Sequence, residues 1–245
     1  MSPLIIAHRG WSAKAPENTL AAFRLAIELG VDGLELDVHM TRDGHVVICH
    51  DETLDRTTNG SGLIAERTLD EIRRLDAGSW FSPDYAGEPV PTLRELLETV
   101  ARSSWRGLIN VELKTGVVLY PGIEKAVADL LREHELSRFA LISSFNHYAL
   151  AEIKRIDPEL ETAILYSEGL YEPWAYAARF GCRTLHPVHF AAPAPIVQGA
   201  HAHGVKVNVW TVDQPERARA LAEAGVDGII TNRPDVVRAA VAGLP

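Results

Sequence analysis

Residues 33–51 read GLELDVHMTRDGHVVICHD, and this stretch holds two short apolar runs separated by a turn sequence. In the first run, Gly33–Asp37, carboxylates alternate with leucines, which is typical of a strand with two different faces. The second run is His45–Cys49, and the four residues directly before it, Thr41-Arg42-Asp43-Gly44, have polar or turn-forming character. The stretch therefore predicts a strand that ends in charged groups, with a second extended run close by.

The link between the two runs permits two geometries. Asp43-Gly44 between apolar runs is typical of a hairpin with a type I′ turn, and a turn centred there places Asp37 opposite His50 in an antiparallel pair. The second run is otherwise a parallel barrel strand, which leaves His50 at its C-terminal end. Both geometries bring Asp37 and His50 together.

Outward from this stretch, short apolar runs alternate with amphipathic segments along the whole chain. Together with Gly33–Asp37, the predicted strands are Leu4–Ala7, Leu108–Glu112, Ala140–Ile142, Thr162–Leu165, Thr184–His186, Lys206–Trp210 and Gly228–Thr231. Apolar residues at three- and four-residue spacing predict helices between them. These are Thr19–Leu29, Thr92–Ala101, Ile123–Glu133, His147–Ile156, Tyr171–Phe180, Pro195–His203 and Pro215–Ala224.

Such regular alternation of strand and helix predicts a parallel sheet. Eight strand and helix units within 245 residues fit an α/β fold of the (β/α)8 TIM barrel type better than an open, doubly wound sheet. A glycine-rich dinucleotide turn, which would favour the open sheet, does not follow the first predicted strand. We expect one domain over residues 1–245.

Residues 51–91 interrupt the alternation, because this stretch is rich in Gly, Thr, Asp and Pro. We interpret it as an insertion on the C-terminal face of the strands, where active sites of barrels lie, and its expected role is that of a lid or a substrate wall. A loop that merely packs on its own aromatic residues, Trp80, Phe81 and Tyr85, is the alternative.

The composition favours a small-molecule partner. Lys and Arg number 24 against 33 Asp and Glu, a net charge of −9, and this balance argues against nucleic acids and anionic membranes as partners. The two cysteines, Cys49 and Cys182, are too isolated for a disulfide framework. Because no signal-like or membrane-spanning apolar segment is found, we expect a cytoplasmic protein without stable membrane association. Nothing in the sequence indicates an oligomeric state.

Carboxylates at the predicted strand ends point to a metal site. Glu35 and Asp37 lie two residues apart and so share one face of a strand, and Glu112 ends another strand. Three acids that converge at one barrel rim repel one another unless a cation lies between them. Their oxygen ligands suit one divalent cation, Mg²⁺ or Ca²⁺, and the sequence does not distinguish these two.

Two cationic residues at the same strand ends indicate an anionic ligand. The positive charges of Arg9, Lys114 and a divalent cation exceed the negative charges of the three carboxylates by one. This net positive charge balances the single negative charge of a phosphodiester. Glu17 is expected either at the metal or beside Arg9. Trp210, at the end of a late strand, is expected to form an apolar wall beside the ligand or to pack in the core.

Two histidines at strand ends, His8 and His50, are candidates for acid–base chemistry, because imidazole titrates near neutral pH. Asp51 is a candidate to orient His50, although neighbouring residues of a strand point in opposite directions. Asn18 or Thr19 is the expected N-cap of the first helix.

In these residues the chain resembles the glycerophosphodiester phosphodiesterase family, in its bacterial cytoplasmic form. The resemblance rests on AHRG ending at Gly10, PENT at Pro16–Thr19, LELDVHMTRDGHVVICHDETLDRTTNGSG at Leu34–Gly62, NVELK at Asn110–Lys114, VNVWTV at Val207–Val212 and a terminal GVDGIITNRP. One position departs from the pattern, because the family often has Asp where this chain has Asn232.

The resemblance implies a metal-dependent barrel that hydrolyses glycerophosphodiesters, such as glycerophosphocholine or glycerophosphoethanolamine, to sn-glycerol 3-phosphate and an alcohol. It also implies an acid–base pair of His8 and His50, the three carboxylates as metal ligands, and Arg9 and Lys114 at the phosphate. The attacking oxygen can come from water or from the glycerol 2-hydroxyl group. Two alternatives are a related barrel phospholipase acting on lysolipids and a non-catalytic protein that binds glycerophosphodiesters.

Overall fold

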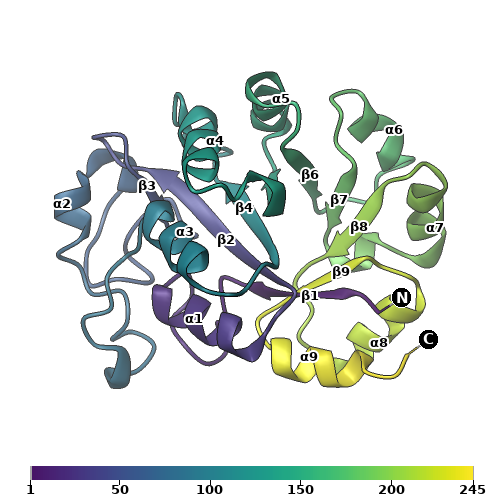
Figure 1. Cartoon of the computed structure of the whole chain (residues 1–245), viewed down its shortest axis with the longest axis horizontal. Coiled ribbons are helices and arrows are strands. Elements are labelled where there is room, and N and C mark those ends of the chain that lie inside the picture. The colour runs from purple at the N-terminus through teal and green to yellow at the C-terminus, as the bar shows by residue number, and fades with distance from the viewer. Residues whose placement is uncertain (1, 245) are drawn as a thin grey trace.

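The computed structural model describes residues 2–244, and its centre is a closed barrel of parallel strands (Figure 1). The barrel strands are β1 (Leu4–His8), β2 (Gly33–Met40), β4 (Leu108–Leu113), β5 (Ala140–Ser144), β6 (Glu161–Tyr166), β7 (Thr184–Pro187), β8 (Lys206–Val209) and β9 (Gly228–Thr231). They pair in this order, and β1 closes the barrel because it pairs with both β2 and β9. The predicted TIM barrel is confirmed.

Helices surround the barrel on its outside (Figure 1). They are α1 (Leu20–Leu29), α3 (Leu93–Arg102), α4 (Ile123–Glu133), α5 (His147–Ile156), α6 (Pro173–Ala178), α7 (Ala194–Ala202), α8 (Pro215–Glu223) and α9 (Pro234–Val241). The short α2 (Leu69–Ile72) belongs to the insertion instead. The sequence prediction missed α9 and made α6 longer at both ends than it is.

Local sequence explains where the helices begin. Thr19, and not Asn18, caps α1 by accepting a hydrogen bond from the backbone of Ala22. At α3, Thr92 and Glu95 form a capping box, in which each side chain binds the backbone N–H of the other residue. The missed α9 begins at a proline that directly follows a polar turn, which is a common start for a helix.

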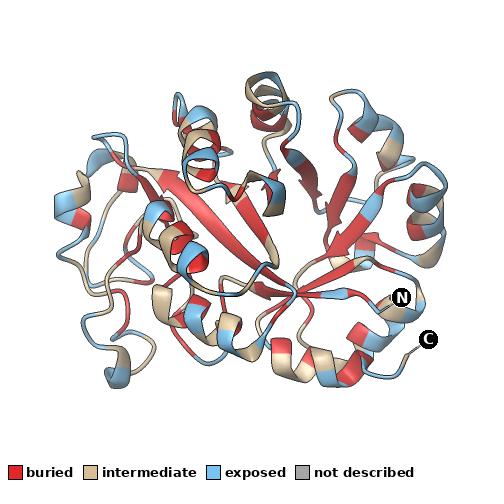
Figure 2. Ribbon diagram, in the orientation of Figure 1, coloured by how far each residue is buried: buried red, intermediate tan, exposed pale blue. Residues whose placement is uncertain are grey.

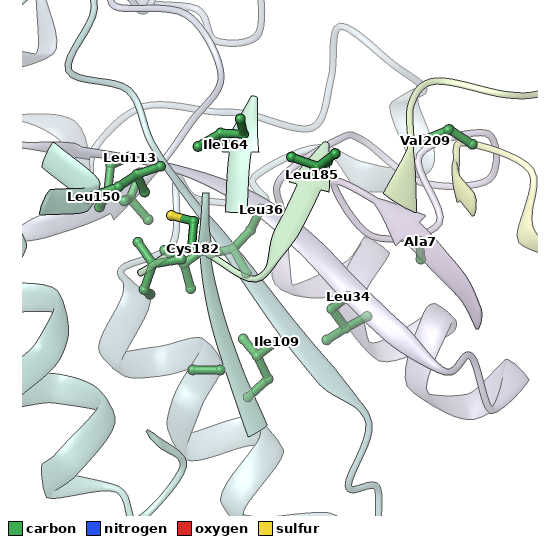
Figure 3. Packing of buried hydrophobic residues seen from close by; sticks show 14 of the residues in the cluster. Ala7, Leu34, Leu36, Ile109, Leu113, Leu150, Ile164, Cys182, Leu185 and Val209 are labelled. Atoms are coloured by element: carbon green, nitrogen blue, oxygen red, sulfur yellow. The ribbon is translucent and has the colours of Figure 1, made fainter. Parts of the chain in front are cut away.

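The main hydrophobic core lies between the strands and the surrounding helices. Figure 3 shows residues that form it, among them Ala7, Leu34, Ile109 and Leu185 of the strands, and Leu150 of α5 belongs to the same cluster. The strands are buried along almost their whole length, whereas the helices expose their outer faces (Figure 2). Residues at alternate positions point into the barrel instead, and they lead to its C-terminal end, where the site lies.

The strand β3 (Val46–Ile48) is an antiparallel partner of β2 and not a member of the closed barrel. The hairpin interpretation is therefore confirmed, but its predicted register was wrong by one residue. Val38 pairs with Ile48, so that Cys49, and not His50, follows opposite Asp37, and the Cys49 backbone N–H donates to the Asp37 carbonyl.

The turn itself explains the shifted register. The backbone N–H of Thr41 donates to the carbonyl of His45, which encloses three residues and not two. Of these three, only Gly44 has a positive φ, of 84°. This is a three-residue hairpin loop with its glycine in the left-handed region, which Asp-Gly serves as well as it serves a type I′ turn.

The insertion forms a lobe beside β3, at the left of Figure 1. It contains α2 and the 3₁₀ turns Ile64–Glu66 and Pro83–Tyr85, and it has a small core of its own. That core consists of Val47, Cys49, Leu54, Ile64, Ile72, Ala77 and Val90. Trp80, Phe81 and Tyr85 pack edge to face, as the alternative interpretation of the insertion expected. Within residues 2–244, no helix combines the length and the apolar character needed to cross a membrane.

Candidate active site

Three carboxylates meet at the C-terminal end of two neighbouring strands. Glu35 and Asp37 of β2 and Glu112 of β4 each offer an oxygen, and these oxygens lie within 4.8 Å of one another. The parallel register explains the meeting, because Asp37 pairs with Glu112 while Glu35 lies two residues earlier on the same face. Glu35 and Asp37 are buried, and Glu112 is largely buried.

Two cationic side chains border the carboxylates. The Arg9 Nε lies 3.3 Å from Asp37, and the Lys114 Nζ lies 3.0 Å from Glu112 and 3.7 Å from Asp37. Burial alone would raise the pKa of Asp37, but the charges of Arg9 and Lys114 outweigh it and lower the pKa to about 2. Asp37 is thus held in the ionised form.

The surroundings of the other two carboxylates, Glu35 and Glu112, disfavour their ionised forms. Burial and the charge of Asp37 raise the pKa of Glu112 to about 7. Burial and the charges of Asp37 and Glu112 also raise the pKa of Glu35 well above its usual range. A divalent cation between these oxygens would remove the repulsion, and carboxylate oxygens are the ligands that hard cations take. The three residues therefore fit a metal ion.

The chain approaches the triad from β1 through an unusual backbone. Arg9 and Gly10 both have positive φ, of 56° and 78°. This turn lets the Arg9 backbone N–H donate to Glu35 at 3.0 Å. A Cβ atom at Gly10 would lie 2.7 Å from the backbone of Ala22, so only glycine fits there. A strained residue that carries a functional side chain is typical of active sites.

Asn18 occupies a second left-handed position, with φ of 58°. Its side-chain amide donates to Asp37 at 2.9 Å, and both residues are buried. Asn18 therefore fixes one oxygen of Asp37 while Thr19 caps the helix. The sequence predicted only a capping role for Asn18.

His8 lies at the end of β1 with one nitrogen fixed by a distant residue. The Asn232 Oδ1 is 2.7 Å from the His8 Nδ1, and the Asn232 amide donates to Asp213 at 2.8 Å. The amide orientation makes Oδ1 the acceptor, so that the His8 Nδ1 carries the proton. The His8 Nε2, 3.9 Å from Glu35, then keeps its lone pair. Burial, and next the charge of Arg9, lower the pKa of His8 to about 4.

His50 is held by a network of ion pairs. The His50 Nδ1–H donates to Asp51 at 2.6 Å, and the Arg56 Nε donates to Asp51 at 2.7 Å. Arg56 also binds Glu17 at 2.7 Å, and Glu17 accepts from Arg9 at 2.8 Å. The network thus runs from the phosphate-binding candidate Arg9 to His50. The hydrogen bond from Arg56, and next the one from His50, lower the pKa of Asp51, and together they outweigh burial, which would raise it.

The backbone at His50 has a further support. The carbonyl of His50 accepts from the His39 Nε2 at 3.1 Å, and the hydroxyl group of Tyr120 lies 2.9 Å from the His39 Nδ1. His50 and Asp51 come after the end of β3, where the chain no longer alternates, and this is why neighbouring residues can face each other.

A cavity opens at this end of the barrel. Trp210 and Phe145 form an aromatic part of its wall, in edge-to-face contact at 5.6 Å between ring centres. The indole N–H of Trp210 donates to the carbonyl of His186 at 2.7 Å. The cavity is lined by His8, Arg9, Glu35, His50, Asn110, Glu112, Lys114, Ser143, Phe145, Leu165, His186, Trp210, Thr211 and Ile230.

The structure thus brings the predicted residues to one place, with two differences. Glu17 binds Arg9 and is not part of the carboxylate triad, which decides between the two expectations for it. Asp51 contacts His50 but does not line the cavity. Arg56, Asp213 and the contact of Asn18 with Asp37 were not predicted from the sequence. The acidic residues around Arg56 in DETLDR were the only signal for its ion pairs.

Comparisons with known proteins agree with this geometry. Residues 8–236 match the model of the "Glycerophosphoryl diester phosphodiesterase family". A glycerophosphodiester phosphodiesterase of Caldanaerobacter subterraneus is 48% identical over 237 residues, with 97% of each chain covered. One from Bacillus altitudinis is 37% identical, with 94% of this chain and 95% of the relative covered.

Solved structures show the same fold. A phosphodiesterase of Oleispira antarctica, in complex with the product sn-glycerol-3-phosphate, has a TM-score of 0.89 at 34% identity. The alignment covers 98% of this chain and 97% of the Oleispira antarctica chain. A glycerophosphodiester phosphodiesterase of Agrobacterium tumefaciens has a TM-score of 0.84 at 33% identity, with 98% and 100% covered. This chain belongs to the glycerophosphoryl diester phosphodiesterase family, and it is a phosphodiesterase acting on glycerophosphodiesters, as the sequence predicted.

Proposed function

We propose that this chain hydrolyses glycerophosphodiesters, such as glycerophosphocholine and glycerophosphoethanolamine, to sn-glycerol 3-phosphate and an alcohol, with one Mg²⁺ or Ca²⁺ ion bound by Glu35, Asp37 and Glu112. The observation that carries the proposal is the meeting of three carboxylate oxygens within 4.8 Å, directly beside Arg9 and Lys114. The product named for the Oleispira antarctica relative supports the choice of sn-glycerol 3-phosphate.

Glu35, Asp37 and Glu112 would hold the divalent cation, which would supply positive charge to polarise the phosphate and to stabilise its transition state. Arg9 and Lys114 bind the phosphate oxygens from either side of the triad. Arg9 can grip two oxygens with its planar guanidinium, while Lys114 acts as a point charge. Both are already oriented by ion pairs with the carboxylates, so little side-chain entropy is lost on binding.

The partners of the two histidines suggest a division of roles. The His8 Nδ1–H is bound to a neutral amide, so His8 is suited to accept a proton at Nε2 from the attacking oxygen. The His50 Nδ1–H is bound to the carboxylate of Asp51, which stabilises an imidazolium, so His50 is suited to give a proton to the leaving alcohol. Glu17 and Asp51 act through Arg9 and His50, which they hold in place.

Trp210 is proposed as an apolar wall for the bound diester, because it lines the cavity and its indole N–H is fixed to the backbone of β7. In this position it excludes water from one side of the phosphate, which strengthens the ionic contacts there.

A panel of glycerophosphodiesters incubated with Mg²⁺, Ca²⁺ or EDTA tests the proposal. We expect release of glycerol 3-phosphate, measured with a coupled dehydrogenase, with at least one of the two ions and its loss in EDTA. Turnover that persists after complete metal removal would refute the proposed metal site. Binding of the diesters without release of product would instead indicate a binding protein.

One observation favours a second candidate substrate, a lysolipid. Several large apolar side chains are exposed on the segments that follow the C-terminal ends of the barrel strands, and one of them, Phe145, lines the cavity. They are Val117, Leu119, Phe145, Tyr148, Tyr171 and Phe190. Exposed apolar patches of this kind often mark lipid or protein contacts. Release of choline from lysophosphatidylcholine at a rate comparable to that from glycerophosphocholine would support this candidate.

We also propose that residues 1–245 form a single barrel domain with a cytoplasmic location. Its partner is a small-molecule substrate, and it has no nucleic-acid or stable membrane partners. The two free and buried cysteines are compatible with a reducing compartment, and one main core runs through all the barrel strands.

A further inference from the structure

The strand β2 carries a third polar residue on the face that holds the candidate metal ligands. Glu35, Asp37 and His39 follow one another at two-residue spacing, so their side chains share one side of the strand. The barrel neighbour β4 pairs with β2 only as far as Val38, and His39 pairs with Val47 of β3 instead. His39 therefore lies just past the carboxylates, and it is completely buried.

Both ring nitrogens of His39 have hydrogen-bond partners. Its Nε2 lies 3.1 Å from the carbonyl oxygen of His50, and its Nδ1 lies 2.9 Å from the hydroxyl oxygen of Tyr120. The Tyr120 ring packs edge to face against the His39 ring, with 5.5 Å between the ring centres. Tyr120 is buried as well, and it belongs to the loop that runs from Lys114 to the start of α4. A chain of two hydrogen bonds thus joins three segments of the protein.

The direction of these hydrogen bonds follows from their partners. A carbonyl oxygen can only accept, so the Nε2 of His39 must carry a proton. The Tyr120 hydroxyl has no other partner among residues 2–244, and burial raises its pKa, so it keeps its proton and donates to the Nδ1 of His39. Without that hydroxyl, a neutral ring can carry its proton on either nitrogen, and only one of these two tautomers donates to His50.

The backbone of His50 depends on this donor because strand β3 ends two residues before it. Here the carbonyl of His50 accepts a hydrogen bond from the side chain of His39 and not from a neighbouring strand. At the other end of the residue, the imidazole Nδ1–H of His50 is bound to Asp51. His50 is therefore held at two points, one on its main chain and one on its ring.

We propose that His39 and Tyr120 are positioning residues for His50, which hold its backbone so that the free Nε2 of its imidazole faces the leaving alcohol. The inference rests on the proposed function, because that function makes His50 the proton donor. Neither His39 nor Tyr120 lines the cavity, so both act through His50 and not on the substrate. A buried pair that only stabilises the fold is the competing explanation.

The first test compares two Tyr→Phe variants with glycerophosphocholine as substrate. In Tyr120→Phe we expect kcat to fall about fivefold with less than about a twofold change in KM, because His50 loses its fixed position while the substrate contacts remain. Tyr166→Phe is the matched control, since its hydroxyl is likewise buried but has no hydrogen-bond partner in the described part of the chain. Its kcat should equal that of the wild type. An unchanged kcat in Tyr120→Phe, or a change confined to KM, would overturn the proposal.

Two substitutions of His39 separate positioning from the filling of space. His39→Leu removes both nitrogens, and kcat should fall about tenfold or more. His39→Gln can offer an amide N–H to the carbonyl of His50 and should recover most of the lost activity. Equal kcat in the two variants, both with wild-type circular dichroism, would contradict the positioning role. Should His39→Leu fail to fold, the comparison of Tyr120→Phe with Tyr166→Phe still decides.

The protonation of His39 can also be measured without substrate or metal, by long-range ¹H–¹⁵N correlation NMR in EDTA. The wild type and Tyr166→Phe should show one form of the ring, protonated at Nε2, whereas Tyr120→Phe should show a second form protonated at Nδ1. A ring that keeps only the Nε2–H form in Tyr120→Phe would refute the role of Tyr120. If the ring behaves as expected but the wild type releases no glycerol 3-phosphate, the proposed function itself has failed, and with it the positioning role.

Discussion

Asn232 places its side-chain oxygen 2.7 Å from the Nδ1 of His8, although the two residues are 224 positions apart in the chain. The barrel closes between β9 and β1, and this closure makes the first and the last strand neighbours. The Asp213 carboxylate accepts hydrogen bonds from the Asn232 side-chain amide and from the Asn232 backbone N–H, and so fixes the orientation of that amide. One imidazole of the proposed acid–base pair is therefore oriented by the last part of the barrel.

The two imidazoles can be tested directly. We expect His8→Ala and His50→Ala each to lower kcat by roughly 10²- to 10⁴-fold, as is usual when a general acid or base is removed. His45→Ala, an exposed histidine in the β2–β3 turn, is the control and should be near wild type. Near-normal kcat in either site variant, with folding verified by circular dichroism, would remove that histidine from the mechanism.

Asn232→Ala should have a smaller effect, about tenfold on kcat with little change in KM, because the ring of His8 loses its orientation but remains present. Steady-state kinetics at saturating Mg²⁺ would measure both values. An increase confined to KM would show instead that Asn232 acts on substrate binding.

Arg56 is expected to matter although it belongs to the insertion and does not line the cavity. In Arg56→Met the contacts to Asp51 and Glu17 are lost, and both His50 and Arg9 lose a support. We expect kcat to fall about tenfold, because the catalytic geometry loosens. The control is Arg73→Met, which breaks a partly exposed ion pair with Glu95 in the same region and should change kcat less than twofold, since such pairs contribute little. Equal kinetics for the two variants would contradict this role of Arg56.

Metal binding should be visible without any substrate. Mg²⁺ or Ca²⁺ at 100 times its dissociation constant stabilises the folded state by about 2.7 kcal/mol, so the melting temperature should rise with the ion concentration. Glu112→Gln should abolish the rise. Without metal, the same variant should melt no lower than the wild type, since it removes one of three crowded carboxylates. A metal-dependent rise that survives in this variant would place the ion elsewhere.

His186 should make the protein sensitive to acid. Its pKa is about 3 in the folded state, against about 6.5 when unfolded, so below about pH 6.5 only the unfolded chain takes up the proton. Its contribution to stability is present above pH 6.5 and is lost as the pH falls toward 3, by about 1.4 kcal/mol per pH unit. Urea denaturation at about pH 6.5 and about pH 4.5 should therefore show a smaller loss in His186→Gln than in wild type. His45→Gln, at an exposed position, is the control. If His186→Gln loses as much unfolding free energy between the two pH values as the wild type does, His186 is not the source of the acid sensitivity.

The carboxylate triad could be predicted from the sequence because two rules apply at once. Residues two apart in a strand share a face, and all parallel strands of a barrel end at the same rim. Glu35, Asp37 and Glu112 satisfy both rules, so their meeting needs no knowledge of the loops. The same rules placed His8 and Arg9 at the rim.

The register of the hairpin could not be predicted in the same way. Asp43-Gly44 suits both a two-residue and a three-residue loop, and only the pairing of Thr41 with His45 decides between them. Arg56 was missed because its partners lie on other segments, at Glu17 and Asp51, and such contacts depend on how the insertion folds back.

The lobe of residues 51–91 has a core of its own, and it reaches the proposed acid–base apparatus through residues at its very beginning, Asp51 and Arg56. Because Cys49 of this core directly precedes His50, the packing of the lobe also holds the segment that carries the imidazole. A substitution that loosens this small core should therefore be felt at His50, although no residue of the lobe lines the cavity.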